Sequence, residues 1–96
     1  MKIRECFDRE SPLFSFEFFP PKDNSGVDAL FETVANLQAL EPTFVSVTYG
    51  AGGNTRENTV AITQRIKHET GIEAMAHLTC VGHSQDELEE VLEKYE

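Results

Sequence analysis

Three polar side chains stand at matching points in three apolar segments: Glu17 in FSFEFFPPK, Thr48 in FVSVTY and His77 in AMAHLTCV. A carboxyl group or an imidazole can transfer protons, and a threonine hydroxyl can orient a ligand. Each residue alone also has a structural interpretation: Glu17 as the partner of a basic side chain, Thr48 as an ordinary strand residue, His77 as a hydrogen-bonded core histidine. Only the recurrence in three segments indicates a site.

The segments that carry these residues have the composition of strands. Strands are predicted over 13–19, 44–49 and 74–81, and Pro20-Pro21 end the first of them. Along each strand, alternation gives one apolar face and one face with polar groups near the carboxyl end: Glu17, Thr48, and His77 with Thr79. The same alternation puts Tyr49 on the apolar face.

Helical patterns separate the strands. A helix is predicted over 25–40, and a second runs from an N-cap at Thr55 to about Thr70, with Gly71 after its end. The apolar stripe of the first comprises Val27, Leu30, Phe31, Val34 and Leu37.

A third helix is predicted to begin after Ser84, which forms the capping-box pattern with Glu87. Its expected inner face comprises Leu88, Val91, Leu92 and Tyr95. The order β-α-β-α-β-α favours parallel strands joined by right-handed crossovers, and ligands of such proteins bind at the carboxyl ends of the strands.

Composition narrows the range of partners and compartments. The chain has 96 residues, 17 acidic against 8 basic side chains and a formal charge of −9, which argues against nucleic acid or an anionic membrane as the main partner. Neither a signal peptide nor a membrane span is recognisable. Cys6 and Cys80 are too few to indicate a disulfide scaffold or a metal site, so a reduced, cytoplasmic protein is expected.

The loop 50–54 (GAGGN) leads from a predicted strand into a helix. Its glycines would let backbone N–H groups approach a phosphate, but they match neither the G-x-G-x-x-G pattern of dinucleotide-binding sites nor the P-loop pattern with its lysine. A tight strand-to-helix turn is the commoner explanation.

Together, FSFEFFPPK, FVSVTYGAGGNTRENT and AHLTCVGHS resemble the opening third of a bacterial-type methylenetetrahydrofolate reductase. The resemblance implies an α/β fold, a (β/α)8 TIM barrel of which residues 1–96 supply the first three βα units within one domain. It further implies FAD at the carboxyl ends of the strands. NADH, preferred over NADPH, would reduce the flavin, which then reduces 5,10-methylenetetrahydrofolate to 5-methyltetrahydrofolate for methionine synthesis.

The resemblance also assigns roles to residues. Glu17 matches the family's general acid, which protonates the bridged folate so that its five-membered ring opens to an iminium. That step requires a carboxyl group that keeps its proton near neutral pH, as an apolar setting among phenylalanines would favour. Thr48 matches a position that contacts the nicotinamide and the flavin edge. Tyr49, Ala51 and His77 match flavin-binding positions, with Tyr49 acting through its backbone or through a bend in the strand.

Three βα units cannot close a barrel, so the 96-residue chain alone is expected neither to hold FAD tightly nor to turn over. Two other hypotheses stay open. One is a non-enzymatic α/β module that oligomerises or binds a partner through its open sheet edges. The other is a different barrel enzyme built from the same three units.

Overall fold

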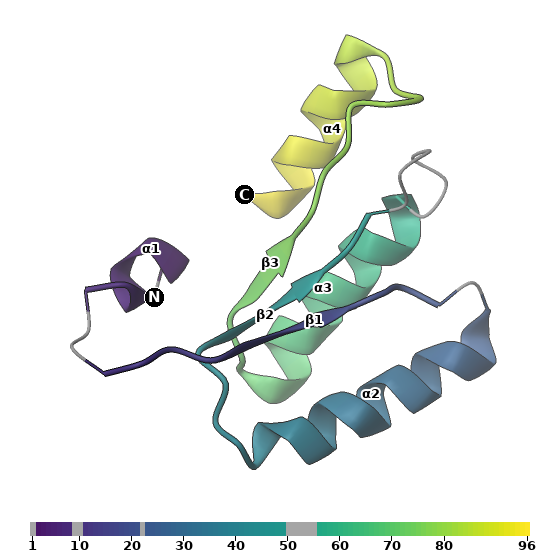
Figure 1. Cartoon of the computed structure of the whole chain (residues 1–96). Helices are drawn as coiled ribbons and strands as arrows, with labels where there is room; N and C mark the ends of the chain where they lie inside the picture. Colours follow the sequence, from purple (N-terminus) through teal and green to yellow (C-terminus); the bar gives the residue numbers. More distant parts are fainter. Residues whose placement is uncertain (1, 9–10, 22, 50–55) are drawn as a thin grey trace.

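A three-stranded parallel sheet organises the chain (Figure 1). The computed structural model describes residues 2–8, 11–21, 23–49 and 56–96. The strands are β1 (Ser15–Phe18), β2 (Phe44–Val47) and β3 (Ala74–Ala76), in the order β1-β2-β3, so that β2 is central. All pairings are parallel, as predicted. This arrangement is compatible with the start of a (β/α)8 barrel.

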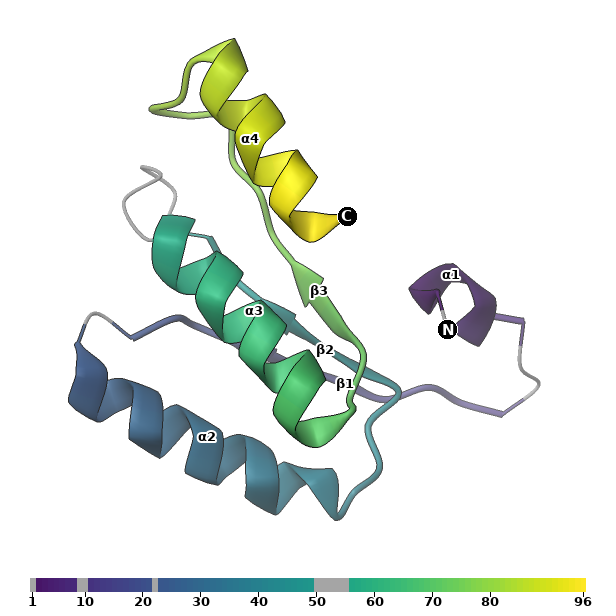
Figure 2. The same cartoon turned by 180° about the vertical axis from the view of Figure 1, so that it is seen from behind.

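The predicted helices follow the strands in the predicted order, and a short one precedes them. The helices are α1 (Ile3–Cys6), α2 (Asn24–Gln38), α3 (Arg56–Thr70) and α4 (Gln85–Tyr95). Seen from behind, α3 lies in front of the strands, and α2 runs below β1 (Figure 2). Both helices contribute side chains to the core on this face of the sheet. Each strand is shorter than predicted. Strand β3 ends at Ala76, and the N–H of the next residue, His77, donates to the Val47 carbonyl.

The strand register fixes which side chains share a face. Glu17 pairs with Ser46, which pairs with Met75, and one step along the strands Phe18 pairs with Val47. Neighbours in register point to the same side of a sheet, so the predicted alternation is confirmed. The helix-covered face carries the core, which comprises Phe18, Val34, Val45, Val47, Ile62 and Ile66.

The start of α2 is fixed by local chemistry. Asp23 caps the helix by accepting a hydrogen bond from the Gly26 N–H at 2.8 Å. That bond, together with one from the Ser25 hydroxyl, holds the pKa of Asp23 below its usual value. Gly26 itself lies against Pro21: a Cβ at position 26 would come within 2.6 Å of the Pro21 Cβ. The first turn of α2 therefore requires a residue without a side chain at position 26.

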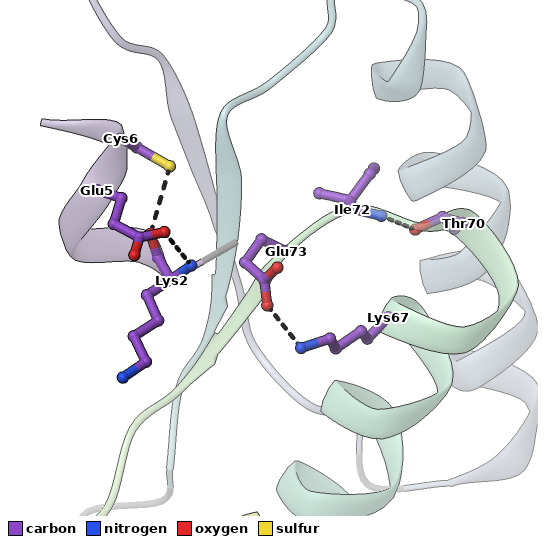
Figure 3. A network of polar contacts seen from close by, with 7 residues as sticks. All are labelled: Lys2, Glu5, Cys6, Lys67, Thr70, Ile72 and Glu73. Atoms are coloured by element: carbon purple, nitrogen blue, oxygen red, sulfur yellow. Dashed lines mark hydrogen bonds and ion pairs between the residues drawn. The ribbon is translucent and has the colours of Figure 1, made fainter. Parts of the chain in front are cut away.

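The end of α3 confirms the predicted role of Gly71. Its φ is 73°, and its N–H donates to the Lys67 carbonyl at 3.1 Å. The Thr70 hydroxyl accepts from the Ile72 N–H, and Lys67 Nζ lies 2.7 Å from Glu73 Oε1, as Figure 3 shows. These contacts bind the last turn of α3 to the start of β3.

The capping box at the start of α4 is confirmed. The Glu87 N–H donates to Ser84 Oγ, and the Ser84 N–H donates to Glu87 Oε1, each at 3.2 Å. Val91 is buried as predicted, but the placement of Leu92 on the inner face was wrong, since it is 54% exposed. One residue along a helix is a turn of about 100°, which carries Leu92 away from the face that packs on α3.

Helix α1 was not predicted from the sequence. It buries Cys6 completely, and the ring of Phe7, which follows it, meets the ring of Phe44 edge-on at 6.3 Å. Phe44 shares a sheet face with Ser46, so Phe7 reaches the face opposite the helix-packed core, at the amino end of the strands. Cys6 and Cys80 are both free thiols. No helix in the described ranges has the length and apolar character to cross a bilayer.

Candidate functional site

Glu17 and His77 meet across the central strand. Glu17 Oε1 on β1 lies 3.4 Å from Nε2 of His77, which directly follows β3. The contact passes over β2, whose side chains on this face, Ser46 and Thr48, are short. Two residues far apart in sequence are thus brought together at the carboxyl end of the sheet, as alternation predicted.

The pair is open to solvent. The Glu17 side chain is 52% exposed and that of His77 is 40% exposed. An ion pair with this exposure contributes at most about 1 kcal/mol to stability, and only while the imidazole is protonated. Stability alone therefore gives little reason for placing an acid and an imidazole together here.

Thr48 lies between the two flanking strands at the same end of the sheet. Its N–H donates to the Phe18 carbonyl, and its own carbonyl accepts from the Thr59 hydroxyl of α3 at 3.0 Å. By register its side chain shares the face of Glu17 and His77. The three predicted residues therefore form one polar group on one face.

The apolar setting expected for Glu17 is not formed by its sequence neighbours. Phe16 and Phe18 point to the helix-covered face, where Phe18 is buried, whereas Glu17 points to the opposite face. Adjacent residues in a strand always separate in this way. The phenylalanine on the side of Glu17 is Phe19, which is 75% exposed.

Tyr49 lies on the other side of the sheet, as its position in the alternation predicted. Its side chain is buried, and its hydroxyl shares a 2.7 Å hydrogen bond with Nε2 of His83. The two rings meet edge-on with centroids 5.7 Å apart. Ala51 and the rest of loop 50–54 lie outside the described residues, and so does the N-cap predicted at Thr55.

His83 is the residue that sequence reasoning missed. No functional motif in the sequence around it distinguishes His83 from a surface residue, yet its side chain is only 4% exposed and its Nδ1 lies 3.9 Å from Glu87 Oε2. A usable signal existed, because the capping box makes His83 the residue just before the N-cap, a position that often packs back onto the first turn of the helix. His68, the remaining histidine, is exposed near the end of α3.

A cavity of about 300 Å³ lies elsewhere. Its lining residues are Phe14, Ser15, Phe16 and Leu40, which surround the amino end of β1 and the end of α2. Glu17, Thr48 and His77 do not line it. The polar group and the cavity are separate features.

Comparison with known proteins finds relatives that are named as reductases. A family model described as methylenetetrahydrofolate reductase matches residues 2–96. The 5,10-methylenetetrahydrofolate reductase of Pectobacterium carotovorum subsp. carotovorum is 44% identical over 81 residues, 84% of this chain and 27% of that protein. The enzyme of the same name from Escherichia coli (strain K12) shows the same identity and coverage. Methylenetetrahydrofolate reductase (NADH) 1 of Arabidopsis thaliana is 40% identical over 92 residues, 96% of this chain and 16% of that protein.

The chain thus spans 27% of the length of these bacterial relatives and 16% of the plant one. The three segments that carry Glu17, Thr48 and His77 all lie within the matched range. Since the family match extends over almost every residue, the chain belongs to the methylenetetrahydrofolate reductase family.

Proposed function

We propose that the protein containing this chain reduces 5,10-methylenetetrahydrofolate to 5-methyltetrahydrofolate with NAD(P)H, through FAD. The observation that carries the proposal is the convergence of Glu17, Thr48 and His77 from three strands on one face at their carboxyl ends. Barrel enzymes place their active sites at that end of the sheet. The family match over residues 2–96 supplies the reaction class.

The residues of this face suit a flavin. An isoalloxazine ring offers hydrogen-bond donors and acceptors along one edge and flat apolar surfaces above and below. The Thr48 hydroxyl and the His77 imidazole can each donate or accept, and the exposed ring of Phe19 adds an apolar surface beside them. We assign flavin contacts to Thr48, Tyr49, Ala51 and His77.

FAD supplies the two-electron carrier between the nicotinamide and the folate. The task of Glu17 is to hold a proton on its carboxyl group and deliver it to the bridged folate, so that the five-membered ring opens to an iminium that accepts the electrons. His77, 3.4 Å from this carboxyl group, fixes its orientation. Because Phe16 and Phe18 point away, bound substrate and cofactor would have to exclude water from Glu17.

NADH is proposed as the preferred reductant, since the Arabidopsis relative carries it in its name. The substrates are small molecules, and the charge of −9 favours them over nucleic acid or a membrane surface as partners. We place the activity in the cytoplasm, at the step that feeds methionine synthesis. Assembly into a homo-oligomer stays open.

The substitution Glu17→Gln, made in the whole protein that contains this chain, tests the proposal. The substitution keeps the shape of the side chain and removes its ability to donate a carboxyl proton. Flavin reduction by NADH should remain within about twofold of wild type, whereas folate reduction should fall by roughly 10²- to 10⁴-fold, the usual contribution of a general acid. Stopped-flow absorbance of the two half-reactions measures both.

Glu32→Gln is the matched control, because Glu32 is an exposed acid on α2, away from the sheet face. It should leave both half-reactions unchanged. Equal loss in both half-reactions of Glu17→Gln would show that Glu17 does not act as the acid for the folate. A purified protein without flavin would contradict the proposed function as a whole.

A further inference from the structure

The carboxyl end of β2 is held from outside the sheet by two hydrogen bonds. The hydroxyl of Thr59 on α3 donates to the Thr48 carbonyl at 3.0 Å, and His83, just before α4, bonds the Tyr49 hydroxyl at 2.7 Å. Both anchoring side chains are buried: Thr59 is 0% exposed, and the side chain of His83 is 4% exposed. Thr48 is thereby hydrogen-bonded to α3, and Tyr49 to the residue just before the N-cap of α4.

Burial alone does not explain the bond to Tyr49. The neighbouring phenol of Tyr95 has a hydroxyl that is also buried and finds no hydrogen-bond partner among the described residues. The fold therefore tolerates a buried phenol without a partner in the described part of the chain, at the cost of desolvation. The short bond between Tyr49 and His83, with the Glu87 carboxylate near the other ring nitrogen, is a more specific arrangement.

We propose that His83 and Thr59 are positioning residues that fix the backbone at Thr48 and Tyr49 where the flavin binds. Tyr49 then meets the flavin through its main chain, because its phenol is turned to the helix side and occupied by His83. The inference rests on the proposed function in one respect, that the carboxyl end of β2 contacts FAD. It explains how a residue on the core face contributes to a site on the opposite face.

A double-mutant cycle tests the anchor. Tyr49→Phe keeps the ring and removes the hydroxyl, whereas His83→Ala removes the imidazole. Each change is made alone, and both are combined, in the whole protein that contains this chain. The readouts are the dissociation constant of FAD from the reconstituted apoprotein, the visible absorbance of bound flavin, and the melting temperature of the apoprotein. Each single variant should bind FAD roughly fivefold more weakly, the equivalent of one neutral hydrogen bond, and the double variant no more weakly than either.

Conservative replacements sharpen the test. His83→Gln keeps a polar group within reach of the Tyr49 hydroxyl and should recover part of the affinity for FAD. Thr59→Val should weaken FAD binding, whereas Thr59→Ser retains the hydroxyl and should not. Tyr95→Phe is the control, because it removes the hydroxyl of a second tyrosine near Tyr49. It should leave the dissociation constant of FAD and the flavin spectrum unchanged, since the Tyr95 hydroxyl has no hydrogen-bond partner in the described part of the chain.

The possible failures are distinguishable. If wild type binds FAD and every variant binds it equally well with an unchanged spectrum, while only melting temperatures fall, then His83 and Thr59 are merely structural and the inference is wrong. If the losses multiply in the double variant, Tyr49 and His83 act independently and the anchor is wrong. A wild-type protein without affinity for FAD would overturn the proposed function and this inference together.

Discussion

Glu17 reaches the candidate site because of the size and direction of the residues around it. The phenylalanines before and after it are turned to the core, and the short side chains of Ser46 and Thr48 leave room for it to reach His77. Alternation along a strand is a local property, so the sequence alone predicted which residues share this face. The distance to His77 depends on two strand pairings and could not be predicted locally.

Tyr95 and His83 show where prediction from sequence stops at this scale. Burial of Tyr95 raises its pKa to about 12, and the nearby Tyr49 adds to the shift. Both Tyr95 and His83 lie in or beside α4, and the residue that acts on each of them, Tyr49, follows β2 more than 30 residues earlier in the chain. No local pattern encodes a contact of that separation.

Replacing Tyr95 with Phe should stabilise the protein. The change removes a buried hydroxyl that has no partner among the described residues, and the free energy of unfolding should rise by up to about 1 kcal/mol at neutral pH. In the unfolded chain this phenol ionises near pH 10, in the folded protein only near 12, so wild type loses stability as pH rises from 10 to 12. Tyr95→Phe should lack that part of the loss.

Chemical denaturation at pH 8, 10 and 11 measures both effects. Ile72→Val is a useful comparison, because it changes a partly buried side chain without an ionisable group. A lower stability of Tyr95→Phe at pH 8 would mean that the hydroxyl has a stabilising partner.

At the scale of elements, the ends of helices were predicted better than the ends of strands. Gly71 and the Ser84–Glu87 box act through residues three or four positions apart, so the pattern and the structure coincide. Strand lengths depend on a partner instead: β3 was expected to reach 81 and ends at Ala76. Helix α1, four residues long, depends on tertiary burial of Cys6 and left no signal in the sequence.

The junction between β1 and α2 allows a sharp test of an element. Gly26→Ala improves helix propensity by about 1 kcal/mol, but its new Cβ would come within 2.6 Å of the Pro21 Cβ. The clash is with the proline ring, which cannot rotate away, so we expect a net loss of roughly 1–3 kcal/mol in the free energy of unfolding. Urea denaturation of the whole protein that contains this chain measures the change in the free energy of unfolding.

Asn36→Ala serves as the control on the same helix. Asn36 is exposed, and alanine is the better helix former, so this variant should be neutral or slightly more stable. If Gly26→Ala gains stability to the same extent, then α2 and Pro21 can move apart enough to accommodate the Cβ, and the predicted clash is wrong.

At the scale of the whole molecule, the described sheet has one central strand and two outer ones. The βαβ order predicted parallel strands joined by right-handed crossovers, because few other topologies can connect consecutive strands through a helix. The large exposed side chains include Phe14, Phe19, Leu40, Val81 and Leu92. Apolar exposure on this scale in a small unit is typical of a surface that another part of a protein covers, which agrees with a chain spanning 27% of its bacterial relatives.

Hydrogen exchange of the backbone amides in the outer strands, β1 and β3, measures whether the barrel is closed. The central segment bonds to both sides: the Val45 N–H of β2 donates to the Glu73 carbonyl, and the N–H of Thr48, just after β2, donates to the Phe18 carbonyl. In contrast, β1 and β3 each have one hydrogen-bonded neighbour among the described residues. In the 96-residue chain by itself, outward amides of β1 and β3 should exchange with deuterium far faster than those of β2. In a closed barrel they would have partners and exchange as slowly as the centre. Slow exchange at an outer strand of the 96-residue chain would mean instead that a second copy pairs with that edge.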